Sequence, residues 1–494
     1  MKKYGVLIIS AIFFLTGVGF YWKAQQTPAT EDLSSLSSSS PLDRVPSSDN
    51  IAEVDTLNRM IFTIKDKTQV DPAIKQIIEY AKQHPESEAA QIYSVFAQPI
   101  YLFKGIAWRL RMLVEPIDAA YIGSISWLRA IKRNSDRRSP HIDALFDYFV
   151  DPNPDENIAG QKGQFVSLAQ FQDYMAKNVN STVLKQLSAL EEILKKNSNE
   201  NNPLFMFDSA LVFGADVGPN MTSQTVRYRK VMPGHIQAII ANMYERMGFG
   251  LYLASYNMEK LARFLNTLTT QSLIAKKSDF QRGILSNVFD IHLQSPKEIS
   301  AVLARNEFAD FMTLRKQSAE YLPKSLTYLR HAINVRIKAF REMEKLSKMP
   351  NQREYFVNPD FIVSRPAVTL AALQKRMKLL YANNAELFTD RVDSKNSFNV
   401  NIAALFNPNN PKIKDLKKLY PRTSDFKADP EKYGSDPKTF KWNYEYGTAQ
   451  NWPDPTFGGL LPGTSTPAQY REKLISISRD ASTPALQAWL RLFM

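Results

Sequence analysis

Asp71-Pro-Ala-Ile-Lys-Gln-Ile-Ile-Glu-Tyr-Ala-Lys-Gln-His-Pro85 contains the pattern that decides the fold of this chain. An acidic residue precedes a proline, whose fixed φ suits the first position of a helix, so we expect Asp71 to cap a helix start. Apolar side chains then return at helical spacing, at Ile74, Ile77, Ile78 and Ala81. The helix should end by His84, because a proline disfavours helical geometry in the residue before it.

The same kind of helix start occurs at four later positions. A Ser or Thr stands before a proline in the pairs Ser139-Pro140, Ser295-Pro296, Thr466-Pro467 and Thr483-Pro484. Apolar residues at helical spacing also run through 184–193, 236–247, 326–343 and 370–380. These patterns predict a mainly α protein with a multi-helix body, for which an α-solenoid is one arrangement that fits.

Composition excludes several kinds of chemistry. The 494 residues include no Cys, so disulfides, thiolate nucleophiles and Cys-based zinc sites are excluded. Only 18 Gly are present, which argues against glycine-rich phosphate loops and a turn-rich all-β fold. The 62 Lys and Arg outnumber the 49 Asp and Glu, which gives a formal charge of +13.

The N-terminus has the pattern of a membrane anchor. After two lysines, residues 4–22 carry no charge, and at about 1.5 Å per residue they span roughly the thickness of a bilayer core. A cleaved signal peptide is the alternative, but Trp22 stands where its cleavage site needs a small residue. We therefore expect residues 1–23 to form a single anchor, with the rest of the chain on the exported side.

The remaining chain divides into three predicted regions. Residues 24–50 are rich in Ser and Pro and have the composition of a disordered linker. Residues 51–350 form the main helical body, and residues 351–494 form a C-terminal helical region. This last region contains a long loop, 421–465, with six Pro, five Gly and eight aromatic residues. So many aromatic residues argue that the loop is ordered.

Short β-branched and aromatic segments interrupt the helical pattern near the middle of the chain. They occupy 204–207, 210–213 and 225–231, with two glycines and a proline between them. This arrangement predicts a small β-hairpin.

No catalytic or cofactor motif is present. The five His have no second His three or four residues away, so we expect capping or partly buried roles for them. The sequence lacks a nucleophile elbow and any phosphate-binding glycine loop. We predict no cofactor and no metal, and a non-enzymatic role is favoured although the enzyme question stays open.

Basic residues gather in two helical segments. The segment 326–343 places Arg330, Arg336, Lys338 and Arg341 mainly outside its apolar face, where they can meet an anionic surface. The alternative is a solvated helix with Glu mixed among these cations. The segment 100–114 is apolar nearly all round, which predicts a core helix with snorkelling basic tips rather than an interfacial helix.

The long C-terminal loop contains the most specific pattern in the chain. Phe440, Trp442, Tyr444 and Tyr446 alternate with polar residues, so an extended segment would present all four rings on one face. Such a row can stack on sugars or bind a partner, with Asn443 and Trp452 as further candidate contacts. The alternative is that the rings pin an irregular loop to the helical body. Residues 451–459 read as consecutive turns.

These observations lead to one expected function and one alternative. We expect a membrane-anchored, exported α-helical binding or scaffold protein of a bacterial, periplasmic cell envelope, held in the inner membrane by a single span. Its expected partners are the membrane, through residues 4–22, and other envelope proteins or peptidoglycan. The alternative is an enzyme that acts on envelope glycan through carboxylates, with the aromatic row as its sugar platform. Nucleic acid is not an expected partner.

Overall fold

The computed structural model describes residues 48–113, 140–150, 154–196, 202–208, 228–261, 296–349, 354–357, 369–389, 396–420 and 453–480, with a few shorter pieces between them. Within these ranges the chain is mostly helical, as predicted, and it contains several small antiparallel hairpins where the sequence predicted one. The predicted anchor and nearly all of the predicted linker lie outside the described residues. None of the described helices has the length and apolar character needed to cross a bilayer.

The α-helices are α3 (Ser48–Phe62), α4 (Val70–Gln83), α5 (Glu88–Ala97), α6 (Ile106–Arg109), α9 (Pro140–Val150), α10 (Leu168–Tyr174), α11 (Asn180–Lys196), α14 (Pro233–Ala254), α17 (Pro296–Leu303), α18 (Ser318–Leu346), α20 (Leu370–Tyr381) and α23 (Pro467–Asp480). Short helical turns of the 3-10 type are η1 (Lys67–Gln69), η2 (Gln98–Phe103), η6 (Asn306–Phe308), η9 (Ile402–Phe406), η10 (Pro411–Ile413) and η11 (Leu416–Leu419). The segment η3 (Met175–Val179) is π-helical and joins α10 to α11 in one continuous rod.

The strands form two-stranded antiparallel ladders, which pair β1 (Asn157–Ile158) with β2 (Gln161–Lys162), β3 (Phe205–Asp208) with β4 (Tyr228–Val231), β5 (Glu386–Thr389) with β6 (Ser397–Val400) and β7 (Phe426–Lys427) with β8 (Thr448–Ala449). The β3–β4 ladder confirms the predicted hairpin, and its register places Phe205 opposite Val231. The segment predicted at 210–213 lies almost entirely outside the described residues.

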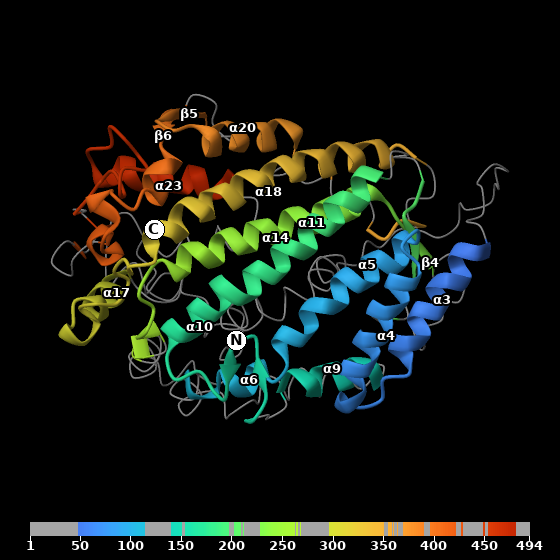
Figure 1. Ribbon diagram of the computed structural model, residues 1–494. Helices are drawn as coiled ribbons and strands as arrows, with labels where there is room; N and C mark the ends of the chain where they lie inside the picture. Colours follow the sequence, from blue (N-terminus) through green and yellow to red (C-terminus); the bar gives the residue numbers. More distant parts are fainter. Residues whose placement is uncertain are drawn as a thin grey trace, which may run out of the picture.

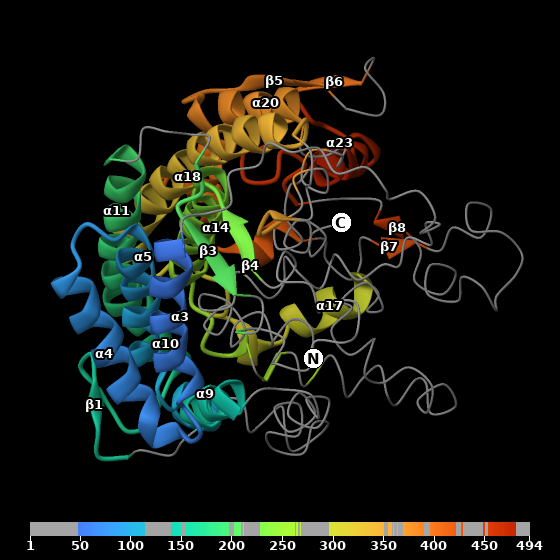
Figure 2. The ribbon, with the colours of Figure 1, turned by 90° about the vertical axis from the view of Figure 1, so that its right-hand side faces the viewer.

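The larger helices form a series in which each helix packs against the next one in chain order. The series consists of α4, α5, α11, α14, α18 and α20. Figure 1 shows α11, α14, α18 and α20 side by side, with α3 to α5 at one end of the molecule and α23 near the other. Figure 2 looks along this arrangement from the end that carries α3 and the β3–β4 hairpin.

The tightest contact in the series joins α14 and α18, which run antiparallel. A Cβ atom added at Gly248 would lie 2.8 Å from Leu329 Cγ and 3.1 Å from the Ser325 carbonyl oxygen. The Ser325 hydroxyl donates a hydrogen bond of 2.6 Å to the Gly248 carbonyl. Near the other end of α14, a Cβ at Gly234 would lie 2.6 Å from Met343 Cε. These glycines let the two backbones approach more closely than larger side chains would permit.

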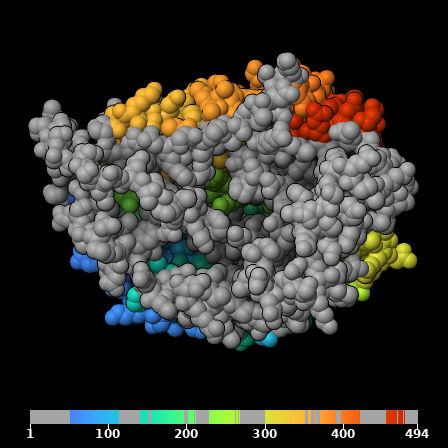
Figure 3. Space-filling model, turned by 180° about the vertical axis from the view of Figure 1, so that it is seen from behind, coloured from blue at the N-terminus to red at the C-terminus, as the bar shows by residue number. Residues whose placement is uncertain are grey.

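Buried apolar side chains form two large clusters, and both include residues of α14 and α18. The first joins α3, α4, α5, α9 and α11 to these two helices, and α18 contributes Tyr328 and Met343 to it. The second joins them to α17, η9 to η11 and α23, and α18 contributes Leu322 and Leu329. Figure 3, which views the molecule from behind, shows the N-terminal helices at its lower left and α23 at its upper right. The predicted boundary at 350/351 stays a prediction.

Several predicted helix boundaries are confirmed. Three helices begin at predicted prolines, namely Pro140, Pro296 and Pro467. Thr466 caps α23 as predicted, because its Oγ accepts a hydrogen bond from the Gln469 amide at 3.3 Å. Helix α4 ends at Gln83 and its C-cap is His84.

The predicted capping role of Asp71 is wrong. Helix α4 begins at Val70, the residue before Asp71, and Asp71 therefore lies within its first turn. The Asp71 carboxylate instead accepts a hydrogen bond of 2.6 Å from the Tyr148 hydroxyl and lies 2.7 Å from Lys104 Nζ. Partners from distant parts of the chain therefore determine the role of this carboxylate.

A buried histidine caps the start of α14. His235 Nδ1 accepts a hydrogen bond of 2.9 Å from the Met232 amide, and Nε2 lies 3.2 Å from the Val357 carbonyl oxygen. This geometry assigns the single proton of a neutral imidazole to Nε2. The side chain is 2% exposed, and burial lowers its pKa to about 4. A proton on Nδ1 would face another donor, so the fold requires the neutral ring.

We expect Gly248→Ala to destabilise the protein and Gly250→Ala to stabilise it slightly. The first change overpacks the α14–α18 contact and should cost about 1–3 kcal/mol. The second lies in the same helix with no atom within 4 Å of the added Cβ, so it should gain up to about 1 kcal/mol of helix propensity. Thermal unfolding followed by circular dichroism should give shifts of opposite sign. A loss of equal size at both positions would contradict the close packing.

Acidification should weaken the fold through His235. The unfolded chain takes up this proton near pH 6.5, whereas the folded chain does so near pH 4. Stability is therefore full above pH 6.5 and falls by up to about 3 kcal/mol as the pH drops to 4. His235→Gln keeps a hydrogen-bond acceptor at this capping position. In urea unfolding measured between pH 4 and 6.5, this variant should lose less stability on acidification than the unchanged protein. His141, whose pKa burial also lowers, contributes equally to both proteins and cancels in the comparison.

Candidate functional site

An open groove of about 440 Å³ lies over α3, α4 and α5, the helices drawn in blue in Figure 1. Its lining residues are Glu53, Tyr80, Glu86, Ser87, Glu88, Ala89 and Leu204. We call it the acidic groove, because three of these seven residues are glutamates and none of the described residues that line it is a lysine or an arginine.

The turn between α4 and α5 fixes one side of the acidic groove. Ser87 caps α5, because its Oγ accepts a hydrogen bond of 3.0 Å from the Ala90 amide. The Gln91 side chain donates to the carbonyls of Ala81 at 2.6 Å and His84 at 3.2 Å, which ties the two helices together. The groove wall is therefore formed by a helical hairpin that a capping residue and hydrogen bonds between the two helices hold in place.

The acidic groove is suited to binding a cationic group. Burial raises the pKa of Tyr80, and the nearby charges of Glu53 and Glu86 raise it further. The His84 ring lies against Tyr80, with centroids 4.2 Å apart, and its Nδ1 is 3.5 Å from the Glu86 carboxylate. Carboxylates beside an aromatic ring favour an ammonium or guanidinium group, such as a Lys or Arg side chain of a partner.

The sequence patterns did not predict the acidic groove. Glu53, Glu86 and Glu88 match no motif and are ordinary residues for a solvated helix surface. The apolar spacing from residue 73 onward predicted helices here. It carried no information on how α3 and Leu204 would close the groove, because that depends on tertiary packing.

Two of the predicted anionic-surface contacts hold α18 against its neighbours. The Arg330 Nε donates a hydrogen bond of 2.6 Å to the Leu380 carbonyl, and its guanidinium lies 5.3 Å from the centre of the Tyr381 ring. Arg336 forms an ion pair with Glu245, and its guanidinium donates to the Asn242 side chain at 2.9 Å. These groups secure α18 to α20 and α14.

The other two predicted contacts, Lys338 and Arg341, are exposed on α18. Within the described part of the chain, neither side chain makes an ion pair or a hydrogen bond. Their role as contacts to an external anion stays a prediction.

The candidate ligand surface of the C-terminal loop cannot be placed. Phe440, Trp442, Asn443, Tyr444, Tyr446 and Trp452 all lie outside the described residues. The aromatic row, and the glycan-enzyme alternative that depends on it, therefore stay predictions.

The segment 100–114 packs in the core where it is described, but it is not the predicted continuous helix with snorkelling basic tips. A turn at residues 104–105 separates η2 from α6, and the tip of Arg109 is buried. Arg109 is 2% exposed, and its guanidinium donates to three backbone carbonyls of the β1–β2 region. The acceptors are Gln161 at 2.8 Å, Gly163 at 3.1 Å and Glu156 at 3.0 Å. Burial lowers the pKa of Arg109, but each of its three nitrogens donates to at least one carbonyl, since Nε also donates to the Lys104 carbonyl at 3.4 Å. This arginine is a structural residue rather than a membrane contact.

The histidines within the described ranges have structural partners, as predicted. His84 and His235 act at helix ends, His141 lies 2.9 Å from the Leu211 carbonyl, and His331 lies 2.6 Å from the Glu191 carboxylate. No group of three or more His, Asp or Glu in the described ranges is arranged to hold a metal ion.

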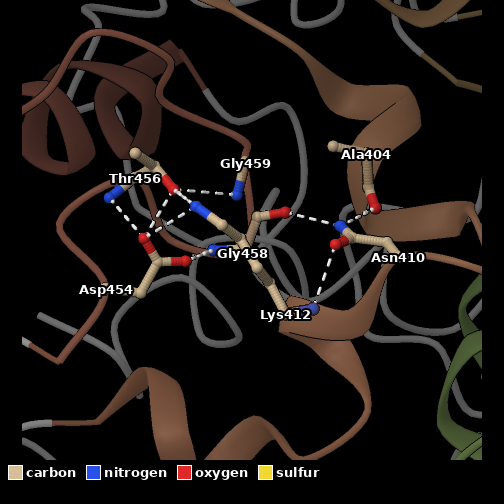
Figure 4. Close-up of polar contacts among 7 residues, drawn as sticks. All are labelled: Ala404, Asn410, Lys412, Asp454, Thr456, Gly458 and Gly459. Carbon is tan, nitrogen blue, oxygen red and sulfur yellow. Dashed lines mark hydrogen bonds and ion pairs between the residues drawn. The ribbon is translucent and has the colours of Figure 1, made fainter.

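A polar clasp centred on Asp454 holds the end of the long loop (Figure 4). One Asp454 oxygen accepts hydrogen bonds from the Thr456 amide at 3.0 Å and hydroxyl at 2.6 Å, and the other accepts from the Gly458 amide at 2.9 Å. Lys412 Nζ lies 3.3 Å from the carboxylate. Burial opposes ionisation of Asp454, but these donors and the cation outweigh it and lower its pKa.

The clasp supports a left-handed turn that buries an aromatic ring. Phe457, Gly458 and Gly459 have φ values of 47°, 66° and 89°. Phe457 is 1% exposed in the second apolar cluster, and the Asn410 side chain donates to the Gly458 carbonyl at 2.7 Å. A Cβ at Gly458 would lie 2.8 Å from Ile413 Cγ2, so glycine is required there for space as well as for φ. The predicted turns are confirmed in this described part.

Removing the Asp454 carboxylate should cost far more stability than removing its cation. Asp454→Ala leaves two amides and a hydroxyl without their acceptor and should destabilise the protein by about 2–3 kcal/mol. Lys412→Ala should cost less than about 1 kcal/mol, because the lysine side chain is 48% exposed. Urea unfolding of both variants checks this difference. Equal losses would show that the ion pair, rather than the amide acceptors, holds the turn.

Comparisons with known proteins identify no relative of this chain. No protein-family model matches the chain, no curated protein matches it, and no solved structure matches it.

Proposed function

We propose that this chain is a membrane-anchored, exported α-helical binding or scaffold protein of a bacterial cell envelope. The observation that carries the binding role is the acidic groove, which combines three glutamates and Tyr80 on the packed surface of α3, α4 and α5. Its chemistry favours a partner that presents Lys or Arg, and another envelope protein is the preferred candidate.

The proposed anchor rests on the sequence. Residues 4–22 are uncharged and follow two lysines, and a Ser- and Pro-rich stretch separates them from the first described helix. This order of segments supports a single span in the inner membrane with the helical body on the exported side.

The proposed scaffold role rests on the helical series. Each helix from α4 to α20 in that series packs on the next one in chain order, which is how solenoid proteins are built. We propose an α-solenoid-like body on this basis. Such bodies offer long surfaces to partners without needing an enclosed cavity.

Site-specific photo-crosslinking tests the binding role in the full chain. A benzophenone amino acid in place of Tyr80 should form an adduct with an envelope component in the cells that make this protein. The matched control carries the same group at Tyr101, an aromatic residue that is 37% exposed outside the acidic groove. Glu53→Gln with Glu86→Gln should abolish the Tyr80 adduct, since it removes the charges that favour a cation.

Two results would contradict the binding role. One is the absence of any adduct from position 80 in intact cells. The other is an identical set of adducts from positions 80 and 101 that the two glutamine substitutions do not change.

A further inference from the structure

The C-terminal end of α18 and the turn that follows it carry three exposed cations. Lys338 and Arg341 lie three residues apart on α18, and Lys348 lies in the turn beyond Leu346, the last residue of the helix. Other sides of the helix are occupied, because Ile337 and Phe340 pack in a cluster with α20 and Met343 packs in the first large cluster. We call these three cations the basic stripe.

The charge around the basic stripe stays positive. From residue 338 to 348 the helix and the turn after it carry four basic and two acidic residues. One of the two acids, Glu342, is half-buried and accepts a hydrogen bond of 3.3 Å from the Gln237 side chain. The other, Glu344, is exposed beside the stripe. Met349 follows the helix and is 44% exposed, so an apolar side chain lies at the end of the row of cations.

The basic stripe lies at the end of the molecule where the described chain begins. Helix α3 starts at Ser48, and Asp55 of this helix accepts a hydrogen bond of 2.6 Å from Tyr228 of the β3–β4 hairpin. That hairpin leads directly into α14, whose Gly234 packs against Met343 of α18. In Figure 2, which looks at this end, α3, the hairpin and α18 all face the viewer.

The length of the preceding chain sets the typical distance between this end and the bilayer. Twenty-five residues separate Trp22, the end of the uncharged run, from Ser48. As the flexible coil that their composition predicts, they span on the order of 25–30 Å. This distance is shorter than the roughly 43 Å length of α18, whose 29 residues rise about 1.5 Å each. The linker therefore favours an orientation in which this end of the body faces the membrane.

We propose that the basic stripe rests on the anionic headgroups of the bilayer that holds the anchor. Its cations complement the negative surface of such a membrane, and Met349 adds an apolar contact at the interface. The contact fixes which end of the body faces the lipid and leaves the remaining helices available to partners. This inference rests on the membrane anchor proposed above.

A cysteine-free chain permits a direct test in the full-length protein. A single Cys replaces either Met349 or Val166, which is 83% exposed next to α10 and near the opposite end of α14. Each Cys carries an environment-sensitive fluorophore, and the protein is reconstituted into phosphatidylglycerol-containing vesicles with a nitroxide quencher on their headgroups. Quenching at position 349 should exceed that at position 166 by about threefold and should fall as salt screens the headgroups.

Charge reversal supplies the second measurement. Lys338→Glu with Arg341→Glu and Lys348→Glu should reduce quenching at position 349 to the level at position 166. The matched control, Lys162→Glu with Lys177→Glu and Lys185→Glu, makes the same change at exposed lysines outside the basic stripe and should leave quenching intact. Circular dichroism checks that both triple variants are folded. If one of them is not, the salt dependence of quenching in the protein without charge reversal tests the proposal instead.

Flotation separates the failure of this inference from the failure of the anchor. The anchor stands if the protein co-floats with both neutral and anionic vesicles. In that case, equal quenching at the two labels, or quenching that charge reversal does not change, overturns the proposed stripe contact. Co-flotation with anionic vesicles alone overturns the anchor and, with it, the proposed contact to the bilayer that holds the anchor, although it shows affinity for anionic lipid. Co-flotation with neither kind of vesicle overturns both.

Discussion

The close approach of α14 and α18 is the contact on which the rest of the described structure depends. Ser325 and Gly248 bring the two backbones together, and Arg336 pairs with Glu245 along the same interface. Because both helices contribute to both large apolar clusters, the contact joins the N-terminal helices to the C-terminal elements. A wider spacing here would open both clusters at once, since closely packed interiors do not deform continuously.

Irregular segments are held by charged side chains that bind mainly backbone atoms. Arg109 donates to carbonyls of the β1–β2 region, and Asp454 accepts from amides of the turn that ends the long loop. In each case one side chain binds several backbone groups of a segment with little regular structure. The two segments keep a defined shape although neither contains much regular structure.

The sequence predicted the features that depend on neighbouring residues and missed those that depend on distant ones. Helix spacing, the Thr466 cap and the β3–β4 hairpin follow from local patterns, and the structure confirms them. The capping role of Asp71 failed because Tyr148 and Lys104, far along the chain, bind its carboxylate. The acidic groove was not predicted for the same reason, because tertiary packing brings its lining residues together. The aromatic row lies outside the described residues, so its side chains stay untested.

The π-helical turn η3 affects how α11 is rotated about the helix axis relative to α10. Phe171 and Val183 are both buried in the first apolar cluster, yet in an unbroken α-helix twelve residues at about 100° each would leave them roughly 120° apart. A π turn absorbs one extra residue, which removes about 100° of that difference. The π turn therefore accommodates one extra residue while both halves of the rod keep facing the core. A single deletion there would restore a regular α-turn and keep this phase, because eleven residues at about 100° each leave the two side chains only about 20° apart.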